Sequence, residues 1–400
     1  MPLSERSFVT QPSIRNMRVR FWGVQGSCPL FPEPREVDEY RRMISDDMLR
    51  RVIDDMRRKS ANRGLTVEQL IGGPDTAANI ALYLQHLGYS DLPVFGGETT
   101  CISIETSDNQ VIMLDAGSGM RNASKHLVGD WGDRARALTV LTTHEHLDHR
   151  SGLPFCHFCY AKPPFDITVY GTRRCLNALD HNYGIFSHKL TPQMHDDDPV
   201  DYRAMAAKFK AIELRDPLES VTAAAEIRPW EVREVSQSFQ IGATTITAFD
   251  VYHGVPRCVA YKICHGPMTF IFCTDHELRM GLDPTDPRQL RSIAAEKRLN
   301  EHCAQADLAY FDGQYFRDEY TGKEPIGLTA AVSRVDWGHG CIEDIIERSQ
   351  NLGIKRTLIG HHDPERGWPE RVELDQWLST KHSTPACVVE LAKCPMVVDL

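Results

Sequence analysis

One short segment constrains this chain more than any other. The sequence Thr142-Thr143-His144-Glu145-His146-Leu147-Asp148-His149 directly follows the apolar run 137–141 and places three imidazoles and two carboxylates at the mouth of an expected strand. Neutral imidazoles and ionised carboxylates suit borderline divalent metals such as zinc, and a tight loop lets four side chains converge on two ions. A structural zinc site would instead be closed by paired Cys or His. The pattern therefore favours an open two-ion site, with a polar loop of chance histidines as the alternative.

Further side chains of metal-ligand type follow later apolar runs, each where an expected strand ends. His253 follows the run 244–251, Asp275 follows 270–273, and His361 and His362 follow 357–359. A single histidine at a strand end is more often a structural histidine than a ligand. Because these groups recur at successive strand ends, together they favour a site on one edge of a sheet sandwich.

The apolar runs predict an α/β chain of strands with interspersed helices. Strands are expected at 18–23, 101–105, 111–114, 138–142, 167–170, 227–230, 239–241, 244–251, 258–263, 268–273, 308–311 and 356–359. Helices are expected near 152 and at 174–184, 287–303, 342–352 and 370–378, with a mixed, partly helical connection to about Leu214. Such an order indicates two sheets faced by helices.

The domain organisation is expected to be simple. Residues 1–16 are polar and predict an arm, and residues 17–400 predict one domain with a helical insertion at about 32–93. The insertion is inferred from apolar residues at helical spacing, namely Val37, Tyr40, Ile44, Met48, Val52 and Met56. It is interpreted either as an amphipathic helix packed on the domain with a solvated charged face, or as a lid or dimer arm.

Composition excludes some classes of function. The net charge of -10 gives no general attraction to a polyanion and argues against broad nucleic-acid binding. No apolar stretch approaches the roughly 20 residues of a membrane span. The 12 cysteines have no disulfide-like framework, and nothing at the amino terminus resembles a signal peptide, so a reduced, cytoplasmic protein is expected.

These motifs resemble those of metallo-β-lactamase-fold hydrolases, and in particular the phosphodiesterase branch that includes tRNase Z, phosphoribosyl cyclic phosphodiesterase and cyclic-nucleotide phosphodiesterases. The resemblance covers residues 17 to about 366 apart from the insertion. It is supported by the segment that begins at His253, because Ala260-Tyr261-Lys262 takes the place of the branch's Gly-Tyr-Arg-type strand. The resemblance implies an αββα sandwich of two mixed β-sheets flanked by helices, with the helical insertion added.

The resemblance also implies two divalent metal ions, zinc in the first place and manganese as the alternative. It assigns His144, His146 and His253 to one ion. It assigns Asp148, His149 and His361 to the other ion, and Asp275 to both as a bridging ligand. His361 is preferred over His362 because the family histidine immediately follows its strand.

A second constellation of the same branch implies phosphodiester chemistry. In tRNase Z-like sequences, an acidic residue after a strand pairs with a histidine in a Gly-His-Ser-Thr loop. The counterparts here are Asp312 and His339, although Gly340-Cys341 replaces Ser-Thr. A carboxylate that holds an imidazole near the departing oxygen keeps it able to donate a proton. Asp148, Asp312 and His339 are therefore the expected catalytic residues, with Asp148 also holding the attacking water.

The expected function is hydrolysis of a small phosphodiester, with a cyclic nucleotide as the favoured substrate class and a homodimer as the implied assembly. Three alternatives stay open: a tRNase Z-like endonuclease for RNA 3′ ends, a lactone or thioester hydrolase, and a nonenzymatic sensor that keeps the fold. The lactone and thioester hydrolases would not need the Asp312–His339 pair.

Overall fold

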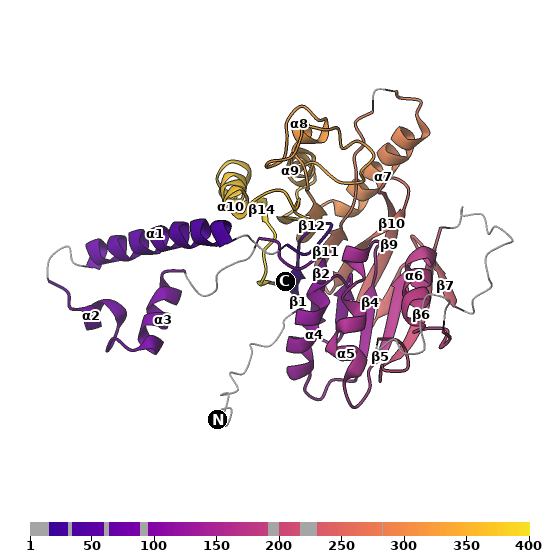
Figure 1. Ribbon diagram of the computed structural model, residues 1–400, viewed down its shortest axis with the longest axis horizontal. Coiled ribbons are helices and arrows are strands. Elements are labelled where there is room, and N and C mark those ends of the chain that lie inside the picture. Colours follow the sequence, from indigo (N-terminus) through magenta and orange to yellow (C-terminus); the bar gives the residue numbers. More distant parts are fainter. Residues whose placement is uncertain are drawn as a thin grey trace.

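Two β-sheets lie face to face, with helices on both outer sides (Figure 1). The computed structural model describes residues 16–30, 34–59, 64–88, 95–190, 200–216, 230–281 and 283–400. The expected αββα sandwich of two mixed sheets is confirmed. The expected polar arm lies outside the described residues except for Asn16, as does most of the strand expected at 227–230.

The first sheet has eight strands in the order β15-β1-β2-β3-β4-β5-β6-β7. Strands β15, β1, β2 and β3 pair in antiparallel fashion, and β3 to β7 pair in parallel. The bounds are Met17–Gly23 (β1), Cys101–Thr106 (β2), Val111–Leu114 (β3), Ala137–Leu141 (β4), Asp166–Gly171 (β5), Lys208–Arg215 (β6), Glu231–Glu234 (β7) and Met396–Asp399 (β15).

The second sheet has seven strands in the order β14-β13-β12-β11-β10-β9-β8. Strands β8 to β11 pair in antiparallel fashion, and β11 to β14 pair in parallel. The bounds are Phe239–Ile241 (β8), Thr244–Tyr252 (β9), Arg257–His265 (β10), Met268–Cys273 (β11), Leu308–Asp312 (β12), Arg356–Gly360 (β13) and Val388–Leu391 (β14).

Three apolar layers hold the sandwich together. The central layer lies between the sheets, with Ile104 and Tyr261 among its buried residues. The second layer joins the first sheet to α4 (Gly119–Gly129), α5 (His157–Tyr160) and α6 (Arg173–Tyr183). The third joins the second sheet to α7 (Pro287–Cys303), α9 (Ile342–Asn351) and α10 (Trp368–Trp377). The short α8 spans Arg317–Tyr320. Burial of apolar surface on both faces of both sheets makes the strand ends rigid supports for polar loops.

The strand directions bring the expected site residues to one edge of the sandwich. Strand β9 is antiparallel to β10, and β10 is antiparallel to β11, so β9 runs in the same direction as β11, β12 and β13. Their carboxyl ends therefore lie at one edge of the second sheet. His253, Asp275, Asp312 and His361 occupy these ends or the positions just after them. The loop that follows β4 of the first sheet faces the same edge.

The described part of the expected insertion consists of three helices. They are α1 (Pro34–Lys59), α2 (Val67–Ile71) and α3 (Ala77–His86). Helix α1 begins beside α10 and then extends away from the sandwich, with α2 and α3 near its far end (Figure 1).

Among the described residues, no helix has the length and apolar character to cross a membrane.

Some elements differ from the sequence-based expectation. The connection expected to be partly helical ends in strand β6, and the helix expected near residue 152 is only a 3-10 turn followed by α5. Helix α4 and strands β14 and β15 were not expected. Strand β6 contains good helix formers, such as Ala211 and Leu214, but its parallel pairing with β5 and β7 decides its conformation.

Candidate metal centre

The loop after β4 carries the HxHxDH pattern and turns sharply. His144 lies between β4 and this turn and is fully buried, while the 3-10 turn Leu147–His149 directs Asp148 and His149 inward. His146 lies at the start of the turn and is exposed. The loop therefore presents four donor side chains toward the ends of β9, β11 and β13.

The first cluster consists of His144, His146, His253 and Asp275, whose donor atoms lie within 4.8 Å of one another. Asp275 Oδ2 is 3.6 Å from His144 Nε2 and 3.5 Å from His253 Nε2. His253 Nε2 is 3.2 Å from His146 Nδ1. Three nitrogens and one carboxylate oxygen at these separations form a donor set of the kind that zinc and similar ions prefer.

The second cluster consists of Asp148, His149 and His361. Asp148 Oδ2 is 3.2 Å from His149 Nε2 and 3.3 Å from His361 Nε2. Asp275 Oδ1 is 3.3 Å from each of these same two nitrogens. Asp275 thus directs one oxygen toward each cluster.

Several donor atoms of the clusters are buried and have no hydrogen-bond partner. Within the described chain these include His144 Nε2, His149 Nε2 and Asp275 Oδ2. A buried polar atom without a partner is destabilising unless a ligand or solvent satisfies it. Because these atoms converge, the residues present fit divalent cations.

Neighbouring groups orient three of the imidazoles. Nδ1 of His144 lies 3.0 Å from Thr143 Oγ1, and Nδ1 of His253 lies 2.7 Å from the Gly338 carbonyl oxygen. His149 Nδ1 lies 2.7 Å from Asp115 Oδ2. Each contact leaves Nε2 directed into its cluster, as is usual for histidines that bind metals.

Gly338 is required by this arrangement. Its φ is +92°, and a Cβ atom there would lie 2.1 Å from His253 Nδ1. A residue with a side chain would therefore both strain the backbone and displace His253.

Asp115 is a buried carboxylate behind the second cluster. Besides His149, it accepts hydrogen bonds from the Thr143 amide at 2.8 Å and from the Thr143 hydroxyl.

We expect Asp115→Asn to weaken zinc affinity about 10- to 100-fold, because the asparagine side chain no longer fixes the tautomer and direction of His149. Competition with a zinc chelator measures this, with Asp133→Asn at an exposed position as the control. Unchanged affinity in Asp115→Asn would contradict the role given to Asp115.

The protonation of the two clusters differs. Burial holds the pKa of His144 well below its ordinary value and lowers the pKa of His253 to about 3, so both rings are neutral near pH 7. Burial also opposes the charge on His361, but Asp275 and other carboxylates outweigh it and raise its pKa to about 9. At His149, too, nearby carboxylates outweigh the effect of burial and hold its pKa well above its ordinary value. Cation binding at the second cluster must therefore release protons.

The backbone is strained at three positions around the clusters. Asp115, Asp275 and His361 have φ values of 54°, 50° and 54°. Residues other than glycine are uncommon in the left-handed region, and such residues cluster at functional sites, where the surrounding structure holds them in place. Asp275 and His361 are thereby aimed at the clusters from the ends of β11 and β13.

Asp312 and His339 form a pair beside the clusters. His339 Nδ1 lies 2.9 Å from Asp312 Oδ2, and the His339 ring stacks on His361 with centroids 4.8 Å apart. Donor atoms of the pair, of Asp275 and of His361 also lie within 4.8 Å of one another. The geometry alone thus permits His339 to act either as a ligand or as a proton donor.

An open cleft leads to these groups. Its lining comprises Ser27, Glu145, His146, Leu147, Asp148, Asp275 and His339. The Ser27 amide donates a hydrogen bond to Asp148 Oδ2 at 3.0 Å. Both clusters and His339 therefore face a space that solvent and a substrate can enter.

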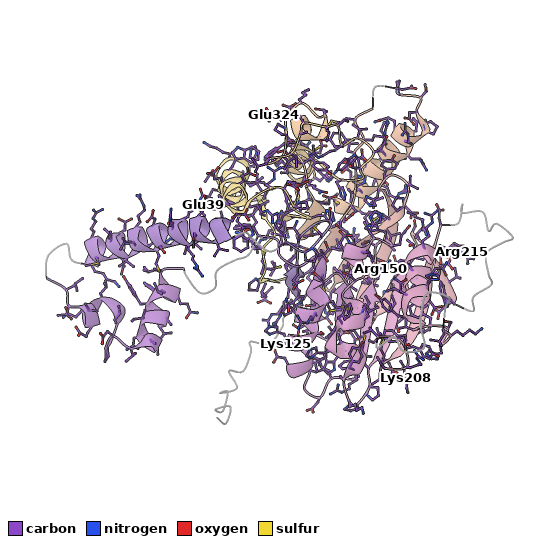
Figure 2. All side chains as sticks on the ribbon, in the orientation of Figure 1. Glu39, Lys125, Arg150, Lys208, Arg215 and Glu324 are labelled. Atoms are coloured by element: carbon purple, nitrogen blue, oxygen red, sulfur yellow. The ribbon has the colours of Figure 1, made fainter. Side chains whose placement is uncertain are left out.

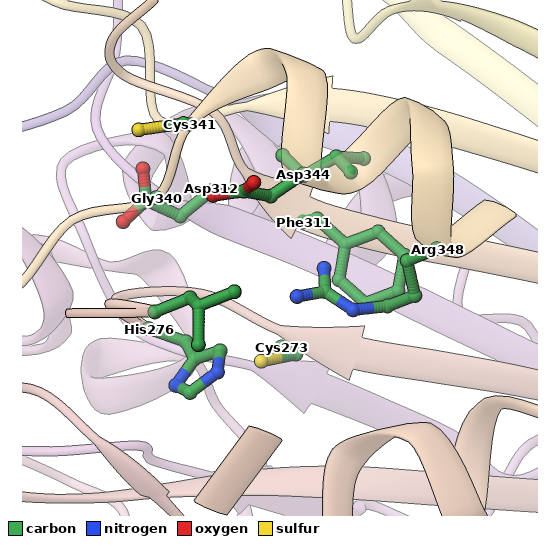
Figure 3. A pocket seen from close by; sticks show the side chains of 10 residues that line it. Cys273, His276, Phe311, Asp312, Gly340, Cys341, Asp344 and Arg348 are labelled. Atoms are coloured by element: carbon green, nitrogen blue, oxygen red, sulfur yellow. The ribbon is translucent and has the colours of Figure 1, made fainter. Parts of the chain in front are cut away.

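A small pocket lies behind the Asp312–His339 pair (Figure 3). His276 and Cys273 line one side of it, and Asp312, Gly340 and Asp344 line the other. His276 Nε2 lies 2.9 Å from Glu296 Oε2, which also binds Arg348. His276 is thus held away from the metal clusters, and its sequence position beside Asp275 gives it no ligand role here.

Glu277 holds the loop that carries His339. Its carboxylate accepts hydrogen bonds from the Asp336 amide at 2.8 Å, from the Gly338 amide at 2.9 Å and from the Tyr320 hydroxyl. Burial raises its pKa. Because the same loop supplies the carbonyl that orients His253, Glu277 supports both the first cluster and the Asp312–His339 pair.

We expect Glu277→Gln to lower the free energy of unfolding by about 1–3 kcal/mol, because an amide cannot accept all three hydrogen bonds and leaves buried donors unsatisfied. Chemical denaturation of the metal-free protein measures this. Glu301→Gln, at an exposed position on α7, is the control and should be near neutral. Equal stability of the two variants would show that the loop does not depend on Glu277.

The structure brings together all of the residues that the sequence and the resemblance selected. His361 lies in the second cluster, whereas His362 Nε2 lies 3.0 Å from the Ala392 carbonyl oxygen and faces away.

Sequence reasoning missed Asp115, Ser27 and Glu277. Asp115 carried a usable signal, because it follows β3 and β3 is the parallel neighbour of β4. Ser27 acts through its amide and Glu277 through loop contacts, so their side-chain types gave no signal.

Comparison with known proteins places the fold. A family model described as a beta-lactamase superfamily domain matches residues 110–362, which is more than half of the chain. No curated protein matches the sequence significantly.

Solved structures with similar folds are distant in sequence. Zinc-bound PqqB from Methylobacterium extorquens is 14% identical over 96% of this chain and 100% of its own, with a TM-score of 0.50. The short form of human tRNase Z is 12% identical over 95% and 98%, with a TM-score of 0.48. A diphosphatase of the PhnP family is 11% identical over 96% and 98%, with a TM-score of 0.47. At such identities the likeness concerns the fold alone.

Proposed function

The chain belongs to the beta-lactamase superfamily, and on this premise we propose that it hydrolyses a small phosphodiester with the help of two divalent cations. We favour zinc, with manganese as the alternative, and a cyclic nucleotide as the substrate class. The observation that carries the proposal is the Asp312–His339 pair next to both donor clusters and at the wall of the cleft.

We assign the ligands by cluster. His144, His146 and His253 would hold one cation, Asp148, His149 and His361 would hold the other, and Asp275 would bridge them. When bound, such a pair of cations lowers the pKa of water and neutralises charge on a phosphoryl group.

The residues of the chain supply the remaining steps. Asp148, whose carboxylate is oriented by the Ser27 amide, accepts a hydrogen bond from the attacking water. The attacking water loses one proton to the solvent, and its oxygen forms a bond to phosphorus as the bond to the ester oxygen breaks. His339 uses Nδ1 to bind Asp312, so Nε2 remains to donate a proton to the departing oxygen. Asp312 fixes the direction of the imidazole.

The overall charge supports a small substrate. At a net charge of -10, the chain does not attract a long polyanion such as RNA through its general field. The role given to His339 also favours an ester with a poor leaving group, since an alkoxide needs a proton donor more than a stabilised anion does.

A hydrolysis screen of the purified, zinc-loaded protein tests the proposal. The substrates are cyclic mononucleotides, cyclic dinucleotides, an aryl phosphodiester, a precursor tRNA and a lactone, and the metal-stripped protein is the control. We expect cleavage of a cyclic nucleotide and of the aryl phosphodiester. Cleavage of the lactone alone would overturn the proposal, and cleavage of the tRNA alone would move the substrate class to RNA.

A further inference from the structure

Glu145 is a carboxylate in the wall of the cleft. It lies between the donor residues His144 and His146 and lines the cleft together with Leu147. Its side chain is 21% exposed, and its Oε2 atom is buried without a hydrogen-bond partner among the described residues. Solvent and salt screen a buried charge less than a surface charge, so the Glu145 carboxylate acts strongly on an ion in the cleft.

Two basic side chains contact Glu145 from outside the cleft lining. Arg150 uses Nε to donate a hydrogen bond to the Glu145 carbonyl oxygen at 2.7 Å, so this contact holds the loop and not the carboxylate (Figure 2). Arg174 Nη1 lies 3.6 Å from Glu145 Oε1, and the Arg174 side chain is 66% exposed. An exposed ion pair of this length is weak, and it therefore offsets the charge of Glu145 only in part.

The cleft lining contains carboxylates but neither lysine nor arginine. Among the described residues that form it, Glu145, Asp148 and Asp275 are acidic, and the basic groups are imidazoles. Sites that hold a phosphate dianion commonly use arginine, whose guanidinium matches the phosphate oxygens, or lysine. The Ser27 amide is already used, because it donates a hydrogen bond to Asp148. Binding of a phosphate group in this cleft therefore depends mainly on the cations.

The carboxylates leave little positive charge for a substrate. Two divalent cations would bring four positive charges, and neutral imidazole ligands would add none. Asp148, Asp275 and Glu145 remove three of these charges. Asp312, bound to His339, offsets a proton on that imidazole. At most one positive charge remains, which balances a phosphodiester with one negative charge but not a phosphomonoester, which carries about two above a second pKa of about 6.

We propose that Glu145 is a specificity-determining residue that makes the cleft select phosphate monoanions over dianions. A phosphodiester binds, whereas a phosphomonoester, such as the product of diester hydrolysis, is held weakly and released. The inference rests on the proposed function for the identity of the substrate. The selection by charge is a property of binding and needs no turnover.

Anion binding to the full-length, zinc-loaded protein tests the proposal. The probes are dimethyl phosphate, a monoanion, and methyl phosphate, which is a dianion at about pH 8. Isothermal titration calorimetry measures both affinities, and phosphorus NMR of the same samples checks that both probes stay intact. We expect the parent protein to bind dimethyl phosphate at least as tightly as methyl phosphate.

Removal of the charge on Glu145 should raise the affinity for the dianion most. Glu145→Gln should bind methyl phosphate about tenfold and dimethyl phosphate about threefold more tightly, because the electrostatic effect scales with the charge of the ligand. Glu145→Asp keeps the charge and should retain the preference of the parent protein. Glu301→Gln removes a charge at an exposed position on α7 and should match the parent protein in both affinities.

An unchanged affinity of Glu145→Gln for methyl phosphate would overturn the proposal. A parent protein that prefers the dianion, or that binds neither probe, would also overturn it. If elemental analysis shows that Glu145→Gln loses zinc, Leu147→Lys provides a second test, because Leu147 lines the cleft and is 62% exposed. This change leaves Glu145 in place, adds a positive charge and should raise the affinity for methyl phosphate about tenfold. An unchanged affinity in Leu147→Lys would contradict the selection by charge.

The binding experiment and the hydrolysis screen give separate answers. Selection by charge without hydrolysis of any phosphodiester would reject the proposed function alone. Hydrolysis of a phosphodiester, with no effect of Glu145→Gln on binding of the dianion, would reject the role of Glu145 alone.

Discussion

Asp275→Asn is expected to lower turnover at least about 10³-fold and to remove most of the tightly bound metal. Asp275 directs Oδ2 toward His144 and His253, and Oδ1 toward His149 and His361. Asparagine keeps the size and tolerates the left-handed backbone at φ 50°, but it offers a single neutral oxygen. Both cations lose a charged ligand at once.

Turnover of an aryl phosphodiester and metal content by elemental analysis measure this effect on the same sample. Asp133→Asn, at an exposed position, is the control and should match the parent protein in both readouts. Near-normal turnover with a full metal content in Asp275→Asn would show that Asp275 does not join the two clusters.

His339→Ala is expected to lower turnover about 10²- to 10⁴-fold while leaving metal content unchanged. The ring binds Asp312 through Nδ1 and lines the cleft, so its loss removes the proton donor and no assigned ligand. The effect should depend on the substrate. Turnover of a phosphodiester with an alkyl leaving group should fall much more than turnover of one with a nitrophenyl leaving group, because the nitrophenyl anion departs without a proton.

Asp312→Asn gives a second measure of the same pair. It should show the same dependence on the leaving group with a smaller loss, because His339 remains but is no longer oriented by a carboxylate. Equal loss of metal and turnover in His339→Ala, with no dependence on the leaving group, would identify His339 as a ligand and contradict its role as an acid.

The clusters were predictable because strand ends fix where polar loops lie. His144, His253, Asp275 and His361 each follow an apolar run, and the directions of β4, β9, β11 and β13 place these runs' ends at one edge. Local sequence signals therefore identified these residues as candidates, and the resemblance to a family decided for His361 over His362. Their pairing into two clusters came from the resemblance to a family.

Strand β6 and residue Glu277 show why the rest could not be predicted. The sequence of β6 suits a helix as well as a strand, and only its place between β5 and β7 decides between them. Glu277 binds amides of a loop 59 and 61 residues away, and such contacts leave no local pattern.

Metal stoichiometry tests the central claim most directly. The metal-stripped protein is reconstituted with excess zinc, freed of unbound metal by gel filtration, and analysed for zinc per chain. The two clusters joined by Asp275 predict two equivalents, falling to one or fewer in Asp275→Asn. Less than one equivalent in the parent protein, or two equivalents that persist in the variant, would contradict a centre of two cations held by these residues.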